Sequence, residues 1–122
     1  MPRTSKSNTA SLHLRVRIAR CGDFAFGPGK AQVLESLLET GSLNRTASVM
    51  KMSYVKALDL VHTMNTHFVK PLVVLSRGGS HGGGAQVTKA GRKVLAEYLA
   101  MSEASEAAAQ PGWRKLRKLL KD

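Results

Sequence analysis

The sequence contains one cysteine, Cys21, among 122 residues. A single thiol cannot form a disulfide within the chain, and no second cysteine stands at the spacing of a zinc site. The composition therefore excludes a disulfide-stabilised domain and a zinc finger, and it is typical of a reducing compartment. We expect a cytoplasmic protein with no metal ion or other cofactor, in which Cys21 is an incidental small apolar residue.

Acidic residues are also scarce. Eight Asp and Glu oppose nineteen Lys and Arg, which gives a formal charge of +11 and a pI of about 10.4. Such an excess of positive charge favours a polyanionic partner, and nucleic acid is the first candidate. We expect no membrane association, because the sequence shows no lipid-anchor motif, no long apolar span and no secretory signal in its first eleven residues.

Aromatic side chains are few, with one Trp, two Tyr and three Phe. Proteins that bind single strands stack bases on clustered aromatic rings, so this composition favours duplex DNA over single-stranded RNA. The residues needed for catalysis are dispersed as well. No Ser-His-Asp or Cys-His set can be assembled from the spacing, so we predict that the protein is not an enzyme.

The remaining pattern predicts one domain that is mostly α with a small β-hairpin, between a flexible basic arm (1–11) and a basic tail (109–122). Apolar and basic residues alternate over 12–18, which predicts a strand with one buried face. Helices are expected over 28–40, 45–50 and 54–68, with Pro28 opening the first and Gly41 ending it. A strand from 72, a returning strand over 85–88 and a helix over 89–108 complete the domain (12–108).

The second and third helices are separated by a very short connection, Lys51 and Met52. Ser42 or Asn44 is expected to cap the second helix, and Ser53 the third. A short helix, a tight turn and a longer helix form the outline of a helix-turn-helix. Helical projection of the third helix buries Ala57, Val61, Met64 and Phe68, and turns outward Val55, Lys56, Asp59, His62, Thr63 and Thr66.

The segment "GGSHGGG", residues 78–84, allows two interpretations. It resembles a phosphate-binding loop in the spacing of Gly79 and Gly84, but Ala85 and Gln86 follow where that motif requires Lys and Ser or Thr. The alternative is the tip of a hairpin that approaches the DNA backbone beside a recognition helix, the wing of a winged helix. The position of the segment after a helix-turn-helix favours the wing.

The stretch 29–91 resembles a known family. "ETGSL", "MSY" followed by Ala57 and "MN", "PLV" and "GGSHGGGAQVTKAGR" are similar to the amino-terminal DNA-binding domain of ModE-type molybdate-responsive transcription regulators, which is itself similar to the LysR-type winged helix. Lys51 departs from the family pattern, in which a small residue or Gly is common at that turn. The resemblance implies a winged helix-turn-helix with a long carboxy-terminal dimerisation helix. It also implies a homodimer on a palindromic operator in double-stranded DNA.

The resemblance, together with the helical projection, gives a set of candidate DNA contacts. Lys56 is the candidate for reading a guanine edge, with a phosphate contact as the open alternative. The full set is Ser42, Asn44, Arg45, Ser53, Tyr54, Val55, Lys56, Asp59, Arg77, Gly78, Gly79, Ser80, His81, Gly82 and Gly83.

ModE-type regulators bind molybdate in a separate carboxy-terminal domain, and the sequence stops soon after its last predicted helix. We therefore do not expect molybdate sensing from this chain on the strength of the resemblance. A small oxyanion-binding protein that holds molybdate with its glycine-rich loop remains the alternative function, because oxyanions and phosphates bind the same backbone N–H groups.

Overall fold

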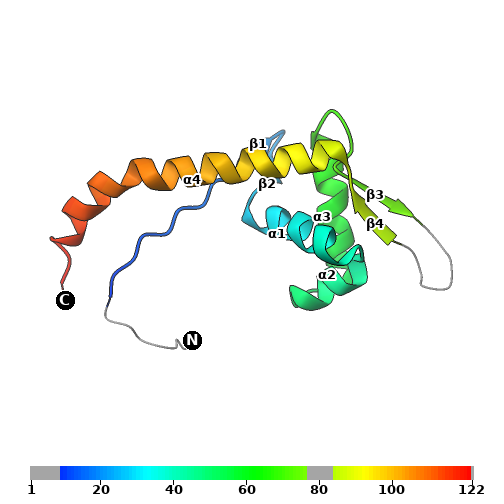
Figure 1. Cartoon of the computed structure of the whole chain (residues 1–122), viewed down its shortest axis with the longest axis horizontal. Coiled ribbons are helices and arrows are strands. Elements are labelled where there is room, and N and C mark those ends of the chain that lie inside the picture. The colour runs from blue at the N-terminus through cyan, green and yellow to red at the C-terminus, as the bar shows by residue number, and fades with distance from the viewer. Residues whose placement is uncertain (1–8, 77–83, 122) are drawn as a thin grey trace.

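The computed structural model describes residues 9–76 and 84–121. It is mostly helical, with two antiparallel hairpins and a long last helix (Figure 1). The predicted winged helix-turn-helix architecture is confirmed. The elements in chain order are β1 (Ile18–Arg20), β2 (Asp23–Phe26), α1 (Pro28–Thr40), α2 (Leu43–Val49), α3 (Tyr54–His67), β3 (Val73–Ser76), β4 (Gly84–Val87) and α4 (Lys89–Arg117).

The first hairpin corrects the sequence prediction. A strand was expected over 12–18, but β1 begins at Ile18 and pairs with β2, which the sequence analysis missed. Cys21 and Gly22 form a two-residue turn in which both φ angles are positive, 53° and 80°. That conformation matches the twist of paired strands, so the turn sets the hairpin and Cys21 has a structural position in it. Val16 and Ile18 still pack against the core, as the alternation predicted.

The predicted caps of the three central helices are confirmed. Pro28 lies in the first turn of α1, and Gly41 ends the helix in the left-handed conformation with φ 67°. The hydroxyl of Ser42 caps α2 and that of Ser53 caps α3. Because Ser42 and not Asn44 is the cap, α2 begins at Leu43 and not at 45.

The turn between α2 and α3 depends on Lys51. Its φ angle is 56°, in the left-handed region that residues with a side chain rarely adopt. This is the position at which the sequence departs from the pattern of the family that it resembles. The tight turn is therefore kept here at some conformational cost, with the amide of Met52 bonded to Ala47 O at 2.9 Å.

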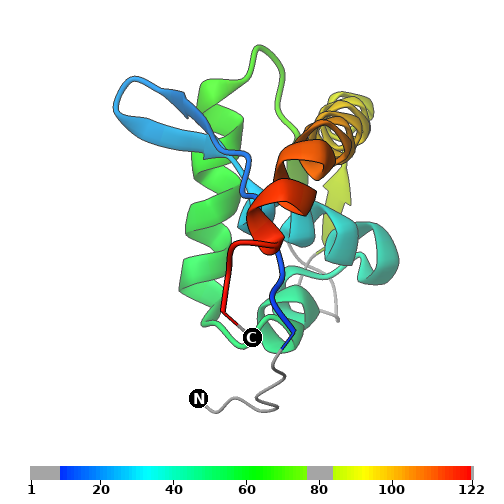
Figure 2. The same ribbon diagram turned by 90° about the vertical axis from the view of Figure 1, so that its left-hand side faces the viewer.

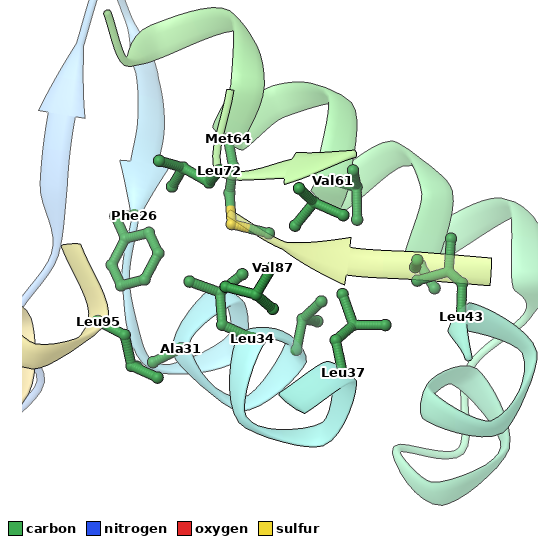
Figure 3. Close-up of a cluster of buried hydrophobic side chains, with 14 of the residues drawn as sticks. Phe26, Ala31, Leu34, Leu37, Leu43, Val61, Met64, Leu72, Val87 and Leu95 are labelled. Atoms are coloured by element: carbon green, nitrogen blue, oxygen red, sulfur yellow. The ribbon is translucent and has the colours of Figure 1, made fainter. Parts of the chain in front are cut away.

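The core lies between α1, α3, the second hairpin and the start of α4 (Figure 3). Phe26, Leu34, Met64 and Leu72 are fully buried in it. The ring of Phe26 meets Phe68 and Tyr98 edge to face, with centroid distances of 6.1 and 5.0 Å. The core thus joins the helix-turn-helix to both hairpins and to α4 in one unit.

A single asparagine on α3 ties the second hairpin to the helix-turn-helix. Asn65 Oδ1 accepts from the amides of Leu72 and Val73, at 2.8 and 3.2 Å, and its Nδ2 donates to Val73 O at 2.9 Å. The start of β3 is therefore fixed to the last turns of α3. The strands β3 and β4 pair in register from Val73 with Val87 to Ser76 with Gly84.

The long helix α4 starts against the same connection. Thr88 Oγ1 caps α4 by accepting from Gly91 N at 2.9 Å, and it donates to Pro71 O at 2.7 Å. A Cβ built on Gly91 would stand 2.3 Å from Leu72 O. Thr88 and Gly91, in the segment "TKAGR", are thus explained by the close packing of the start of α4 against residues 71–72.

The extent of α4 differs from the prediction. A helix over 89–108 was expected, but α4 continues to Arg117 with Pro111 inside it, so the predicted boundary at 108/109 falls within the helix. Residues 114–117 are good helix formers, and Arg114, Lys115 and Arg117 place positive charge at the helix carboxyl end, where the dipole favours it. The last turns of α4 extend beyond the rest of the molecule (Figure 1).

Candidate nucleic-acid interface

The outward face of α3 is the central feature of the candidate interface. Ala57, Val61 and Met64 are fully buried, as the helical projection predicted, whereas Phe68 is half-buried. Val55 is 73% exposed and Tyr54 is 44% exposed, although both side chains are apolar or largely so. Figure 2 shows α3 on one side of the molecule and α4 on the other. The face of α3 is therefore not covered by α4.

The polar residues predicted on α3 also lie at the surface. Lys56, Asp59 and His62 are exposed, and Thr63 is half-buried. Asp59, which a phosphate would repel unless a cation paired with it, forms no ion pair among the described residues. A helix that presents apolar, cationic and anionic groups together in its first two turns has the mixed chemistry that reads base edges.

Ser42 and Ser53 have structural roles at this face. Ser42 Oγ accepts from Arg45 N at 3.1 Å, and Ser53 Oγ accepts from Lys56 N at 3.0 Å. The hydroxyls are exposed or partly so, but each is held by a backbone amide. Asn44 and Arg45, in the first turn of α2, are exposed and form no side-chain hydrogen bond among the described residues.

The predicted wing residues Arg77, Gly78, Gly79, Ser80, His81, Gly82 and Gly83 lie outside the described residues. The two strand ends that flank them are described. Gly84 N donates to Ser76 Oγ at 3.2 Å, and Ala85 N donates to Gly41 O at 3.2 Å. The hairpin end is therefore attached directly to the turn that leads into α2, next to the helix-turn-helix.

The first hairpin packs against the other end of α3. Arg20 donates to Nδ1 of His67 at 3.1 Å, and His67 Nε2 lies 3.4 Å from a carboxylate oxygen of Asp23. Because an arginine has only donors, Nδ1 must be unprotonated and the imidazole proton is on Nε2. This chain of contacts holds the hairpin beside α3.

Of three cationic residues near this hairpin, Lys30 was not among the predicted contacts, whereas Arg15 and Arg17 belong to the basic face expected from the alternation over 12–18. Arg15 and Arg17 precede β1, and Lys30 lies in the first turn of α1, close to Lys56 on α3. Burial, followed by the charge of Lys56, lowers the pKa of Lys30, while Asp23 and Asp59 oppose the shift. The alternation over 12–18 signalled a basic face, but only the fold brings Lys30 to it.

Within residues 9–76 and 84–121, no group of three or more His, Cys, Asp or Glu side chains is arranged to hold a metal ion. None of the helices in these ranges combines the length and the apolarity that a bilayer crossing requires.

No protein-family model matches the chain. The chain is 42% identical over 77 residues to the molybdenum transport protein ModE of Azotobacter vinelandii, a match that covers 63% of this chain and 28% of that protein. It is 34% identical over 71 residues to the transcriptional regulator ModE of Yersinia pestis, covering 58% of this chain and 27% of that protein. It is also 33% identical over 91 residues to the molybdenum-pterin-binding protein MopA of Rhodobacter capsulatus, covering 75% of this chain and 34% of that protein.

The chain thus spans about a third or less of the length of these curated relatives. The shared part is the ModE amino-terminal region, so the resemblance predicted from the sequence is confirmed. These relatives are named as transport, regulatory or binding proteins, and none of the three names denotes an enzyme.

Proposed function

Since the chain is homologous to the amino-terminal region of ModE, we propose that it is a transcriptional regulator that binds double-stranded DNA with sequence preference in the cytoplasm. In this proposal α3 is the recognition helix and enters the major groove, while the tip of the β3–β4 hairpin approaches the adjacent backbone. It is not an enzyme, and its partner is DNA.

One observation carries the proposal more than any other. The first two turns of α3 bury Ala57 on the core side, yet leave Val55 73% exposed beside the exposed Lys56 and Asp59. A valine so placed buries little of its side chain in this subunit. In a major groove it would contact a thymine methyl group, which is the chemistry by which apolar side chains read sequence.

Affinity and specificity would come from different residues. Arg45, Lys56 and the other cations of the exposed face neutralise phosphates, so binding falls steeply with added salt. Tyr54, Val55 and Asp59 contact base edges near the start of α3, where each well-made contact is worth about 1–3 kcal/mol of discrimination.

An apolar groove supports the proposed homodimer. The groove encloses about 500 Å³ between α4, β1 and residues 68–72, and its lining includes Ile18, Phe68, Val69, Leu72, Val94 and Met101. Val69 is fully exposed, and Leu99 and Met101 are 43% and 44% exposed on α4. Pairing of two copies through this region would bury these side chains and carry two α3 helices to the two halves of a palindrome.

A competition gel shift tests the proposal. Wild-type protein is titrated against fragments of its own genome in the presence of excess nonspecific competitor DNA. We expect a subset of fragments to remain bound, and we expect Lys56→Ala to weaken them. Loss of every band under competition would leave nonspecific attraction as the sole activity and overturn the proposal.

The names of the Mop relatives favour a second candidate, a molybdenum-linked oxyanion site. In that case the glycine-rich loop would hold the anion with backbone amides. Titration calorimetry with molybdate, in the absence of DNA, separates the candidates. Saturable binding supports the oxyanion site, and absence of heat supports the regulator alone.

A further inference from the structure

A small basic pocket opens at the start of α1. It encloses about 190 Å³, with polar walls from Arg15, Arg17 and Lys30 and apolar walls that include Phe24, Phe26 and Leu60. No carboxylate lines it. Three cations around a space of this size attract a single small anionic group more strongly than any other kind of partner.

The positive charge of the pocket is only partly balanced within the described part of the chain, by Asp23 and Asp59, which act on Lys30. The side chains of Arg15, Arg17 and Lys30 form no hydrogen bond and no ion pair with other described residues. The guanidinium of Arg17 lies 4.9 Å from the ring centroid of Phe24, a stacking contact that leaves its N–H donors available. Tyr98 donates to Val16 O at 2.8 Å, which fixes the backbone between the two arginines.

The backbone adds donors to the same place. Gly27 precedes α1 without a capping side chain, and the first turn contains no acidic residue. Ala31 N bonds to Gly27 O at 2.9 Å, so the amides of Gly29 and Lys30 come before the helical ladder and lack partners within it. The partial positive charge of a helix amino end further favours an anion.

Lys30 shows the electrostatic consequence. Burial and the nearby charge of Lys56 lower its pKa, because both make its ammonium form less favourable. An anion in the pocket would relieve this cost. The pocket therefore gains more from binding an anion than an equally exposed group of cations would.

The position of the pocket identifies which anion it meets. Leu60 of α3 lines it, and Lys56 of α3 is near Lys30, so the pocket adjoins the exposed face of the recognition helix. The β3–β4 hairpin is attached at Gly41, at the other end of the thirteen-residue α1. Because an α-helix rises 1.5 Å per residue, the pocket at the start of α1 and the hairpin attachment at Gly41 are about 20 Å apart. In Figure 1 α3 lies between the first hairpin and the β3–β4 hairpin.

We propose that this pocket binds one backbone phosphate of duplex DNA, at the end of α1 remote from the β3–β4 hairpin. The inference rests on the proposed function and adds a specific phosphate site to it. DNA would then be held on both sides of α3, by the second hairpin on one side and by Arg15, Arg17 and Lys30 on the other.

The test uses a 30-base-pair duplex of arbitrary sequence, because phosphate contacts do not depend on sequence. Binding of wild type, Arg17→Ala and Gly29→Glu is measured by fluorescence anisotropy over a series of salt concentrations. Nothing lies within 4 Å of a Cβ built on Gly29, so Gly29→Glu fits and places a carboxylate in the first turn. We expect Gly29→Glu to retain or raise thermal stability while it weakens binding about tenfold.

We expect Arg17→Ala to reduce the slope of log affinity against log salt by about 1, the value for one lost phosphate contact. Ala107→Glu is the matched control for charge. It introduces the same carboxylate at an exposed position in the far part of α4, and we expect a smaller loss of affinity and an unchanged salt slope.

The outcomes separate this inference from the proposed function. If wild type binds the duplex and both pocket variants bind it with wild-type affinity and slope, the phosphate site is wrong while the regulator remains. If wild type fails to bind any duplex, the proposed function is wrong. Saturable binding of inorganic phosphate that Arg17→Ala abolishes, together with unchanged duplex binding, would assign the pocket to a free anion and overturn the proposal.

Discussion

Lys30 shows how one residue can oppose stability and favour binding. Its charge is disfavoured in the folded chain, since burial and Lys56 lower its pKa below the ordinary value of 10.5. A cation kept at such a position is explained if a phosphate neutralises it. Gly91 is a different case, in which a residue is required for packing alone, because a backbone oxygen occupies the space of its missing Cβ.

Replacement of Lys30 by Met should raise stability and weaken DNA binding. At neutral pH both the folded and the unfolded chain hold the proton on Lys30, so the folded chain bears the full cost of the charge. As pH rises through the lowered pKa towards 10.5, the folded chain loses this proton first and the cost disappears. We therefore expect Lys30→Met to have the higher unfolding midpoint at pH 7, with the difference shrinking as pH approaches 10.5. Thermal unfolding at several pH values checks this, and a lower midpoint at pH 7 contradicts it.

Gly91→Ala should destabilise the protein. Alanine favours a helix over glycine by about 1 kcal/mol, but its Cβ would overlap Leu72 O at 2.3 Å, and overpacking of this kind costs about 1–3 kcal/mol. We expect the overlap to dominate and the urea midpoint to fall. Gly112→Ala in the same helix is the control, because nothing lies within 4 Å of its Cβ, and that variant should be neutral or more stable.

At the scale of elements, the predictions that succeeded rest on local chemistry. Ser42, Ser53 and Thr88 each cap a helix through their own hydroxyl, and Pro28 and Gly41 bound α1 through backbone preferences. Such effects need only neighbouring residues, so the helix starts can be predicted from the sequence.

Elements that depend on less obvious local conformations were predicted less well. The first hairpin turns at Cys21, a residue that seldom adopts positive φ, so the turn is only weakly signalled in the sequence. The helix α4 continues through Pro111, a residue that ordinarily ends a helix. The pocket beside α3 brings together Arg15, Arg17 and Lys30 from separate parts of the chain. The spacing of these residues in the sequence does not indicate that they lie close together in the fold.

Asn65 is predicted to set the orientation of the second hairpin relative to α3. Its side chain satisfies two amides and one carbonyl of residues 72–73, which would lose these partners in Asn65→Ala. We expect a loss of about 1–3 kcal/mol in the free energy of unfolding. Hydrogen exchange of the β3 and β4 amides should accelerate more than that of α1. Equal protection of the hairpin in the variant and in wild type would show that Asn65 does not fix it.

The molecule as a whole has two functional sides. The helix α3, which carries the exposed face and contributes Leu60 to the basic pocket, lies to the left in Figure 2, while α4 begins at the right. This separation allows two copies to pair through α4 and the apolar groove without covering either DNA-contacting face. A dimer arranged in this way would meet two half-sites about one helical turn apart or at a multiple of that spacing.

Met101→Glu should separate the proposed dimer. Met101 lines the apolar groove and is 44% exposed in the single chain, so a carboxylate there is tolerated by the fold but not by an apolar interface. We expect sedimentation velocity to show that the variant is a monomer. Its thermal unfolding midpoint should be close to that of wild-type protein at concentrations low enough for the wild type to be monomeric. A wild-type protein that sediments as a monomer at all concentrations would contradict the proposed pairing.

The central claim is that the outward face of α3 lies in the major groove, and site-directed DNA cleavage tests it most directly. Cys21→Ser removes the single natural thiol, and Val55→Cys then places a thiol on the exposed face for attachment of an iron chelate. On a fragment retained under competition, the account predicts two clusters of cuts about one helical turn apart, or a multiple of that. A second protein with the chelate at Ala107→Cys should not reproduce this pattern. Uniform cleavage from position 55, or the same pattern from position 107, would contradict the claim.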